Sequence, residues 1–166
     1  MLGLISSLLL LALVAFPCAA AVNPRDSLAM LEGEWTIEGK EAWFRESCAW
    51  YEGRSHMVCT SESRRASGVR RGVSVMSYSE NAKRLVYYHY GSSGAVVALD
   101  LFVEGGVLTA TGERAEGADL VRSQVSMTPR ADGSFDFREE ESRNGGPWTT
   151  TASIRYVRIA GAPKGE

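Results

Sequence analysis

Hydrophobic and polar side chains alternate in short runs with a period of two residues from residue 34 to residue 159. Period two is typical of a β-strand with one buried face, because successive side chains point to opposite faces of the sheet. After residue 30, no window keeps apolar residues at helical spacing for three turns. The runs predict strands over 34–38, 41–51, 55–62, 69–78, 84–90, 95–103, 107–112, 120–128, 134–142 and 148–159.

Turn-forming residues separate these runs. Glycine, asparagine, aspartate and serine supply the positive φ angles or the side-chain hydrogen bonds that tight hairpins need. The clusters are Gly53-Arg54, 79–82, 91–94, Gly105-Gly106, Asp132-Gly133 and 144–146. A meander of many short strands tends to close, because closure removes its exposed edges. The predicted fold class is all-β, an up-and-down antiparallel β-barrel of about eight to ten strands.

The N-terminal segment has a different composition. Residues 1–21 carry no charged side chain, and their leucine-rich run ends in small residues that suit a signal peptidase. A membrane-spanning helix needs about 20 apolar residues, whereas the run over 8–22 is shorter and is broken by Pro17. We therefore expect a signal peptide over 1–21 and one domain over 22–166, in a periplasmic or secreted protein. Asp26 is expected to cap a single helical turn over 27–30.

Length and charge narrow the possible partners. A chain of 166 residues supports one domain with an ordinary core. The formal net charge is -2, and the basic residues are dispersed apart from 64–65 and 70–71. Such a chain offers no broad basic field, so we expect no nucleic-acid partner. We also expect no membrane span in the mature chain, and the oligomeric state is left open.

Export changes the role expected of the cysteines. Cys18 falls within the predicted signal peptide, so the mature chain keeps only Cys48 and Cys59. Outside the cytoplasm, an even number of cysteines indicates a disulfide. Two buried free thiols are the alternative. A metal site at this pair would lack further cysteine or nearby histidine ligands.

The hairpin around Gly53-Arg54 allows a register to be predicted. If these residues form the turn, Cys48 lies opposite Cys59, and Trp50 lies opposite Met57. Directly opposed β carbons lie about 4.5–5.5 Å apart, close to the separation of about 3.5–4.5 Å in a disulfide. We therefore predict a disulfide between Cys48 and Cys59, on the inner face of the barrel together with Trp50 and Met57.

The start and the end of the chain resemble a known superfamily. Gly33-Glu34-Trp35 at the first strand, the meander, and Arg155 or Arg158 on the last strand are similar to lipocalins and fatty-acid-binding proteins, the calycins. The resemblance implies that Trp35 packs across the closed end of the barrel with an arginine over its ring, a cation–π contact. It makes Gly33, Trp35, Arg155 and Arg158 structural candidates.

A narrower resemblance is to the DUF1579 family of small bacterial barrels. It is carried by Leu31-x-Gly33-x-Trp35-x-x-x-Gly39, Cys48-x-Trp50-Tyr51-x-Gly53, Val58-Cys59-x-x-Glu62, Tyr78-Ser79 before Lys83-Arg84, and Tyr156-Val157-Arg158. This resemblance implies the fold and carries no settled activity.

Histidine content bears on cofactors and catalysis. The glycine–tryptophan start is also similar to nitrobindin, but a haem site of that type needs a histidine on a late strand, and no histidine follows His89. Only His56 and His89 are present, without a Gly-x-Ser-x-Gly or a His-Glu-x-x-His motif. We therefore expect no cofactor, no metal and no catalytic residue.

The densest aromatic run covers 87–90. Alternation sends Tyr88 and Tyr90 to one face of the sheet and Tyr87 and His89 to the other. Each pair has an apolar neighbour on its own face, so alternation does not decide which pair faces inward. Phenols and an imidazole inside an apolar cavity would orient a small ligand. The alternative is an aromatic ladder that stabilises the sheet.

Charged side chains supply further candidates. Arg122 or Arg155 would hold a ligand carboxylate through a bidentate fork if either faced inward. If the phenylalanines of 135–137 face inward, Glu139 is either a buried carboxylate near the rim or the first residue of a solvated run over 139–141. We expect the second arrangement.

These features predict an exported, non-catalytic protein that binds a small, largely apolar ligand inside the barrel. The candidate ligand-binding residues are Trp50, Tyr88, His89, Tyr90 and Arg122. One alternative is an envelope protein-interaction module with a filled barrel, and another is a cavity-based hydrolase or isomerase. Sequence alone does not decide whether the barrel is hollow.

Overall fold

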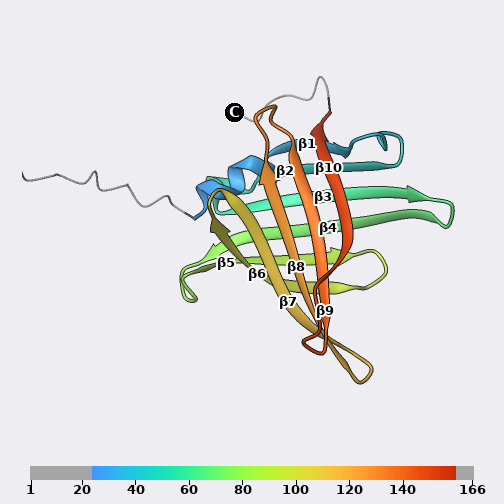
Figure 1. Ribbon diagram of the computed structural model, residues 1–166. Helices are drawn as coiled ribbons and strands as arrows, with labels where there is room; N and C mark the ends of the chain where they lie inside the picture. Colours follow the sequence, from blue (N-terminus) through green and yellow to red (C-terminus); the bar gives the residue numbers. More distant parts are fainter. Residues whose placement is uncertain (1–23, 160–166) are drawn as a thin grey trace, which may run out of the picture.

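The computed structural model of the protein describes residues 24–159, so the predicted signal peptide lies outside the described residues. Within this part, ten antiparallel strands follow one another around a closed barrel, in which β1 pairs with both β2 and β10 (Figure 1). The strands are β1 (Gly33–Ile37), β2 (Phe44–Trp50), β3 (His56–Arg65), β4 (Gly68–Ser79), β5 (Arg84–Gly91), β6 (Val96–Glu104), β7 (Val107–Glu116), β8 (Asp119–Pro129), β9 (Phe135–Arg143) and β10 (Thr149–Arg158). The predicted up-and-down barrel is confirmed.

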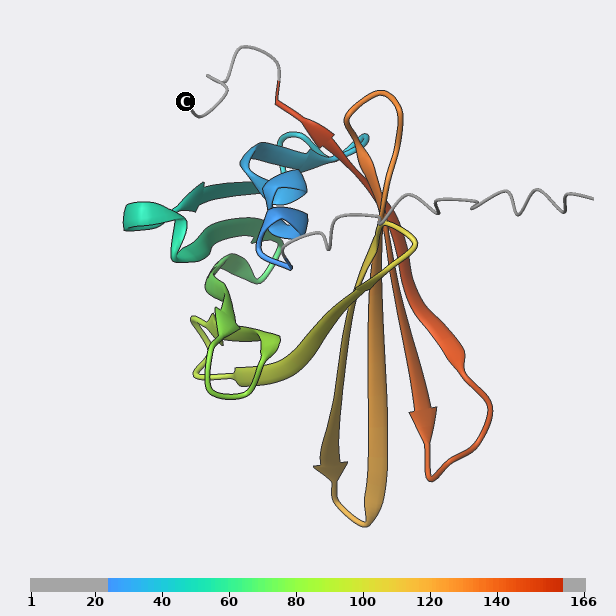
Figure 2. The same ribbon diagram turned by 90° about the vertical axis from the view of Figure 1, so that its left-hand side faces the viewer.

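The barrel is not uniform around its circumference. Strands β2 to β4 cross the view of Figure 1, whereas β7 to β10 run steeply down it. Strands β6 and β7 pair only between 100–104 and 107–111. Beyond this stretch the two strands diverge, and the β7–β8 and β9–β10 hairpins extend away from the rest of the molecule (Figure 2).

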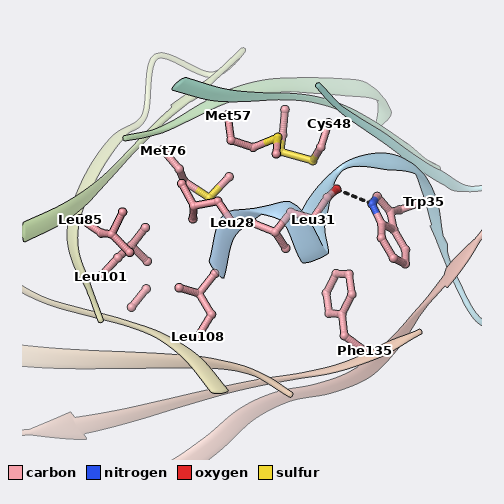
Figure 3. Close-up of a cluster of buried hydrophobic side chains, with 12 residues drawn as sticks. Leu28, Leu31, Trp35, Cys48, Met57, Met76, Leu85, Leu101, Leu108 and Phe135 are labelled. Carbon is pink, nitrogen blue, oxygen red and sulfur yellow. Dashed lines mark hydrogen bonds between the residues drawn. A yellow bond between two sulfur atoms is a disulfide. The ribbon is translucent and has the colours of Figure 1, made fainter. Parts of the chain in front are cut away.

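A 3-10 helix closes one end of the barrel. Helix η1 (Asp26–Leu31) buries Leu28 and Leu31, which pack with Trp35 in the cluster of Figure 3. The indole Nε1 of Trp35 donates a hydrogen bond of 2.6 Å to the carbonyl oxygen of Leu31. Asp26 is the first residue of this helix and makes no side-chain cap, so the expected role of Asp26 is wrong. The closed end gives the interior a floor.

An arginine covers Trp35 from outside, as the family resemblance implies. The Cζ atom of Arg158 lies 4.3 Å from the centroid of the Trp35 ring. Arg155 is not at this position: its guanidinium group pairs with Asp132 and with Glu38 at the surface. The cation–π partner on the last strand is therefore Arg158.

The hairpin of β2 and β3 has the predicted register. Cys48 lies opposite Cys59 and forms a disulfide with it, and Trp50 lies opposite Met57. The turn includes a short 3-10 segment, η2 (Glu52–Arg54). Because disulfides persist in oxidising surroundings, this bond indicates an oxidising compartment. Among the described residues, no helix has the length and apolar character needed to cross a membrane.

Candidate functional site

The interior of the barrel contains a cavity of about 330 Å³. The disulfide, Leu31 and Met76 form part of its wall, and aromatic side chains form another part. The aromatic lining residues are Phe44, Tyr87, Phe135, Phe137 and Tyr156. The polar lining residues are Glu46, Ser61, Ser74, His89 and Glu139. No lysine or arginine is among the described residues that line the cavity.

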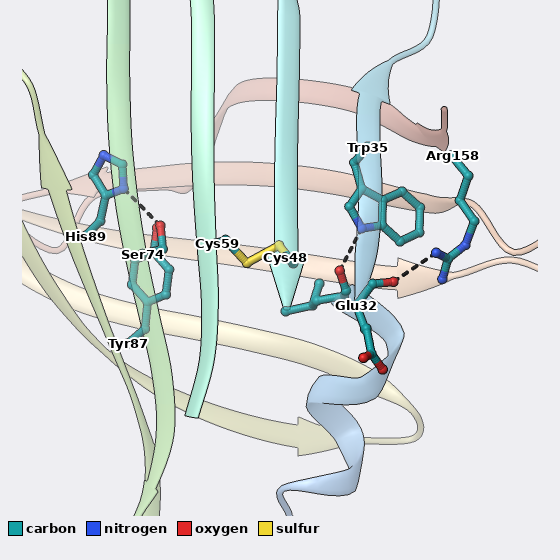
Figure 4. Close-up of a disulfide and its surroundings, with 9 residues drawn as sticks. Glu32, Trp35, Cys48, Cys59, Ser74, Tyr87, His89 and Arg158 are labelled. Atoms are coloured by element: carbon teal, nitrogen blue, oxygen red, sulfur yellow. Dashed lines mark hydrogen bonds between the residues drawn. A yellow bond between two sulfur atoms is a disulfide. The ribbon is translucent and has the colours of Figure 1, made fainter. Parts of the chain in front are cut away.

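A hydrogen-bonded triplet projects into this space from β4 and β5. Ser74 lies opposite His89 in the sheet, and its Oγ is 3.0 Å from His89 Nδ1 and 3.1 Å from Tyr87 Oη (Figure 4). Desolvation lowers the pKa of His89 and raises the pKa of Tyr87. Both side chains are therefore neutral near pH 7. A Cβ atom at Gly72 would overlap the His89 ring, so glycine makes room for the imidazole.

Glu46 is the most unusual residue of the cavity. It lies two residues before Cys48 on β2, and one carboxylate oxygen lies within 4.8 Å of the sulfur atoms of Cys48 and Cys59. No described residue donates a hydrogen bond to this carboxylate or forms an ion pair with it. Desolvation raises the pKa of Glu46 to about 7. Because both sulfurs are bonded to each other, the group offers no thiolate pair to a metal ion.

Tyr156 is the centre of the aromatic wall. Its ring stacks on Phe135 at a centroid distance of 4.7 Å and also contacts Phe44 at 5.6 Å and Phe137 at 5.9 Å. Desolvation, and secondarily the nearby charge of Glu46, raises the pKa of Tyr156 well above the usual value for a phenol. No described residue makes a hydrogen bond with its hydroxyl group. The wall thus presents aromatic faces and one unpartnered hydroxyl group.

Of the sequence candidates, His89 lines the cavity. Trp50 faces inward beyond it, against the core, and is covered by the guanidinium group of Arg54 at 4.6 Å. Tyr88 and Tyr90 are 42% and 49% exposed on the outer surface. Leu85, Tyr87 and His89 take the inner face, because Leu85 packs with the buried core. The inclusion of Tyr88 and Tyr90 in an interior site is therefore corrected to Tyr87.

Arg122 also lies outside the barrel, where its guanidinium group pairs with Glu113 at 2.7 Å. Arg122 and Tyr88 line an outer groove of about 590 Å³ that Trp148 borders. The groove lies where β6 and β7 diverge, and Leu99 lines both this groove and the interior cavity. An inward arginine at position 122 is therefore not available to hold a ligand carboxylate.

The expected end of the inner face at Phe137 is also wrong. Glu139 lines the cavity, because β9 keeps regular pairing with β8 past Phe137, with Glu139 opposite Val125. Glu140 and Glu141 form surface ion pairs with Arg138 and Arg114. Only the last two residues of the acidic run therefore engage in surface ion pairs.

Sequence reasoning missed Glu46, Ser74 and Tyr156 as lining residues. A signal for Glu46 was present, since period two from Cys48 and Trp50 places Glu46 on the same inner face. Ser74 lies opposite His89 in the sheet, but alternation alone did not decide which face His89 takes, so Ser74 was not assigned to the interior.

A scan against protein-family models found no match to the chain. A search of curated proteins found no match either.

Proposed function

We propose that the barrel binds a small, largely apolar molecule in its interior cavity. The observation that carries this proposal is the cavity of about 330 Å³ behind the closed end of the barrel. Small-molecule sites occupy about 300–1,000 Å³ and combine apolar walls with a few polar groups that orient the ligand. Here the aromatic residues around Tyr156 supply the walls, and Glu46, Ser74 and His89 supply polar groups.

The cellular setting is part of the proposal. We propose that residues 1–21 are a signal peptide and that the mature protein is periplasmic or secreted, as a calycin-like or DUF1579-like barrel. The Cys48–Cys59 disulfide supports an oxidising compartment. The alternative of an interaction module with a filled barrel is less favoured, because the interior retains space.

A second candidate function is hydrolysis, which the Ser74–His89 hydrogen bond favours. A neutral imidazole next to a hydroxyl group is the arrangement of a nucleophile and its base. Against it, no carboxylate of the described residues hydrogen-bonds to His89, and Ser74 lies within the regular pairing of β4. Labelling of Ser74 by a fluorophosphonate probe, absent in Ser74→Ala, would favour hydrolysis over simple binding.

Native mass spectrometry of gently purified protein tests the binding proposal. We expect a constant extra mass on the wild-type barrel. Ala110→Phe places a ring in the cavity and should remove this mass. Ala98→Phe, at an exposed position of β6, should retain it. Thermal unfolding establishes that each variant is folded. Repeated bare spectra of the wild type, or unchanged extra mass on folded Ala110→Phe, would contradict the proposal.

A further inference from the structure

Resting on the proposed binding function, we infer that the cavity selects an organic cation: an apolar molecule with a protonated amine that lies against Glu46. The inference concerns the polar end of the ligand, which the cavity volume alone does not specify. It depends on the charges inside the barrel, on the aromatic wall, and on the lack of a hydrogen-bond or ion-pair partner for Glu46 among residues 24–159.

The charges of the cavity favour a cation. Glu46 and Glu139 both line it, and neither side chain has a hydrogen-bond donor or a basic partner among the described residues. An ionised carboxylate that is removed from water without a partner is costly. An ammonium group would offset this cost through a charge-assisted hydrogen bond. An anionic ligand would instead place further negative charge beside the Glu46 carboxylate.

The aromatic wall suits the same ligand. Cations are attracted to the faces of aromatic rings within about 6 Å of the ring centroid. The rings of Phe44, Phe137 and Tyr156 line the cavity together with Glu46. The charge of Glu46 contributes to the raised pKa of both Tyr156 and Tyr87, so both phenols lie within its electrostatic reach. A single ammonium group at Glu46 therefore lies near aromatic rings as well.

The other titratable groups of the cavity do not supply this cation. Tyr87 and His89 face it from β5, Glu139 from β9 and Tyr156 from β10. His89 has a lowered pKa, so it is neutral when Glu46 is ionised. No described residue that lines the cavity therefore supplies a positive charge to Glu46, and we assign this charge to the ligand.

Basic residues at the rim of the barrel would favour a negatively charged ligand group instead of a cation. A hollow of about 210 Å³ shares Phe44, Ser61 and His89 with the cavity and is bordered by Arg70 and Arg71. Arg71 is paired with Glu62 at 3.1 Å, and Arg70 is exposed. A ligand carboxylate at this rim is the main rival, and the experiment includes it as an outcome.

Three probes of one shape separate these possibilities: 3-phenylpropylamine, 3-phenylpropan-1-ol and 3-phenylpropanoate. Calorimetric titration at pH 8 measures the affinity of each for wild-type protein, Glu46→Gln, Glu139→Gln and Glu104→Gln. Glu104 is an exposed carboxylate on β6, and its variant is the matched control. We expect the amine to bind at least about tenfold tighter than the alcohol, and the carboxylate to bind most weakly.

Glu46→Gln should remove the preference for the amine, Glu139→Gln should reduce it, and Glu104→Gln should leave it unchanged. At pH 5.5 the amine keeps its charge while Glu46 is protonated, so the preference should also fall there. Equal binding of alcohol and amine would overturn the cation inference and leave the binding proposal standing. Tightest binding of the carboxylate, abolished by Arg70→Ala, would overturn it in favour of the rim. Binding of none of the three would count against both the inference and the proposed function.

Discussion

The guanidinium group of Arg158 occupies the space next to Gly33 in which any other residue would place its Cβ atom. Gly33 also has a φ angle of +126°, which L side chains rarely adopt. From this position Arg158 covers the Trp35 ring and donates a hydrogen bond of 2.8 Å to the carbonyl oxygen of Glu32. Gly33 therefore leaves the space that the guanidinium group of Arg158 needs to cover Trp35. This contact explains why the glycine lies two residues before the tryptophan in the Gly33-Glu34-Trp35 motif.

Gly33→Ala should lower the free energy of unfolding by about 1–3 kcal/mol, because it strains the backbone and displaces Arg158. Gly39 is the matched control: its φ is +73°, but nothing lies within 4 Å of a Cβ atom there. Urea unfolding of Gly33→Ala, Arg158→Ala and the double variant should show non-additive effects, while Gly39→Ala and Arg158→Ala add. Additive effects for Gly33 and Arg158 would contradict the coupling.

Trp35→Ala should lower the free energy of unfolding by about 3–5 kcal/mol, as expected for deletion of a large core side chain. Trp35 is fully buried and contacts the ring of Phe135 at a centroid distance of 4.8 Å. Trp43, which is 58% exposed, provides the control, and Trp43→Ala should cost much less. A loss below about 1 kcal/mol for Trp35→Ala would show that the ring does not close the barrel.

Protein made in an oxidising compartment should have a mass that is lower by two hydrogens than after reduction, since Cys48 and Cys59 are bonded. Replacing both cysteines by alanine should lower the free energy of unfolding by about 3 kcal/mol on the chain-entropy model for so short a loop. Intact mass measurement and urea unfolding check the two parts. Two free thiols in such material would refute the bond.

Glu46→Gln should stabilise the protein in a pH-dependent manner. The pKa of Glu46 is raised from 4.5 to about 7 by burial. Below pH 4.5 the Glu46 carboxyl group is neutral in both the folded and the unfolded protein, so its burial does not make stability depend on pH there. Between pH 4.5 and 7 it ionises only in the unfolded chain, so wild-type stability falls as pH rises. Above pH 7 the full cost, about 3 kcal/mol, is present.

Urea unfolding at pH 4 and pH 8 measures this effect. Relative to wild type, Glu46→Gln should gain stability at pH 8 that is absent at pH 4, and Glu104→Gln should show no such difference. A gain of the same size at both values would mean that Glu46 is not desolvated in the folded protein. The cost of keeping Glu46 at this position is what the proposed ligand amine would offset.

Local pattern alone predicted most of the framework. Alternation and turn residues identified all ten strands of the described part, and the hairpin at Gly53-Arg54 paired Cys48 with Cys59. Strand register near a short turn depends only on residues close in sequence, so it can be worked out from the chain. The same local argument extends to Glu46, which shares the face of Cys48.

Tertiary structure decided what the interior contains. Over 85–90, both faces of the strand carry an apolar side chain, so alternation does not identify the inner face. Leu85 packs with core residues far along the chain, and this packing turns Tyr87 and His89 inward and leaves Tyr88 outside. The choice between Arg155 and Arg158 over Trp35, and the cavity itself, likewise depend on how β10 meets β1 when the barrel closes. A period of two fixes which residues share a face, but the side of the sheet that becomes the inside, and the space left there, follow from long-range packing of all strands together.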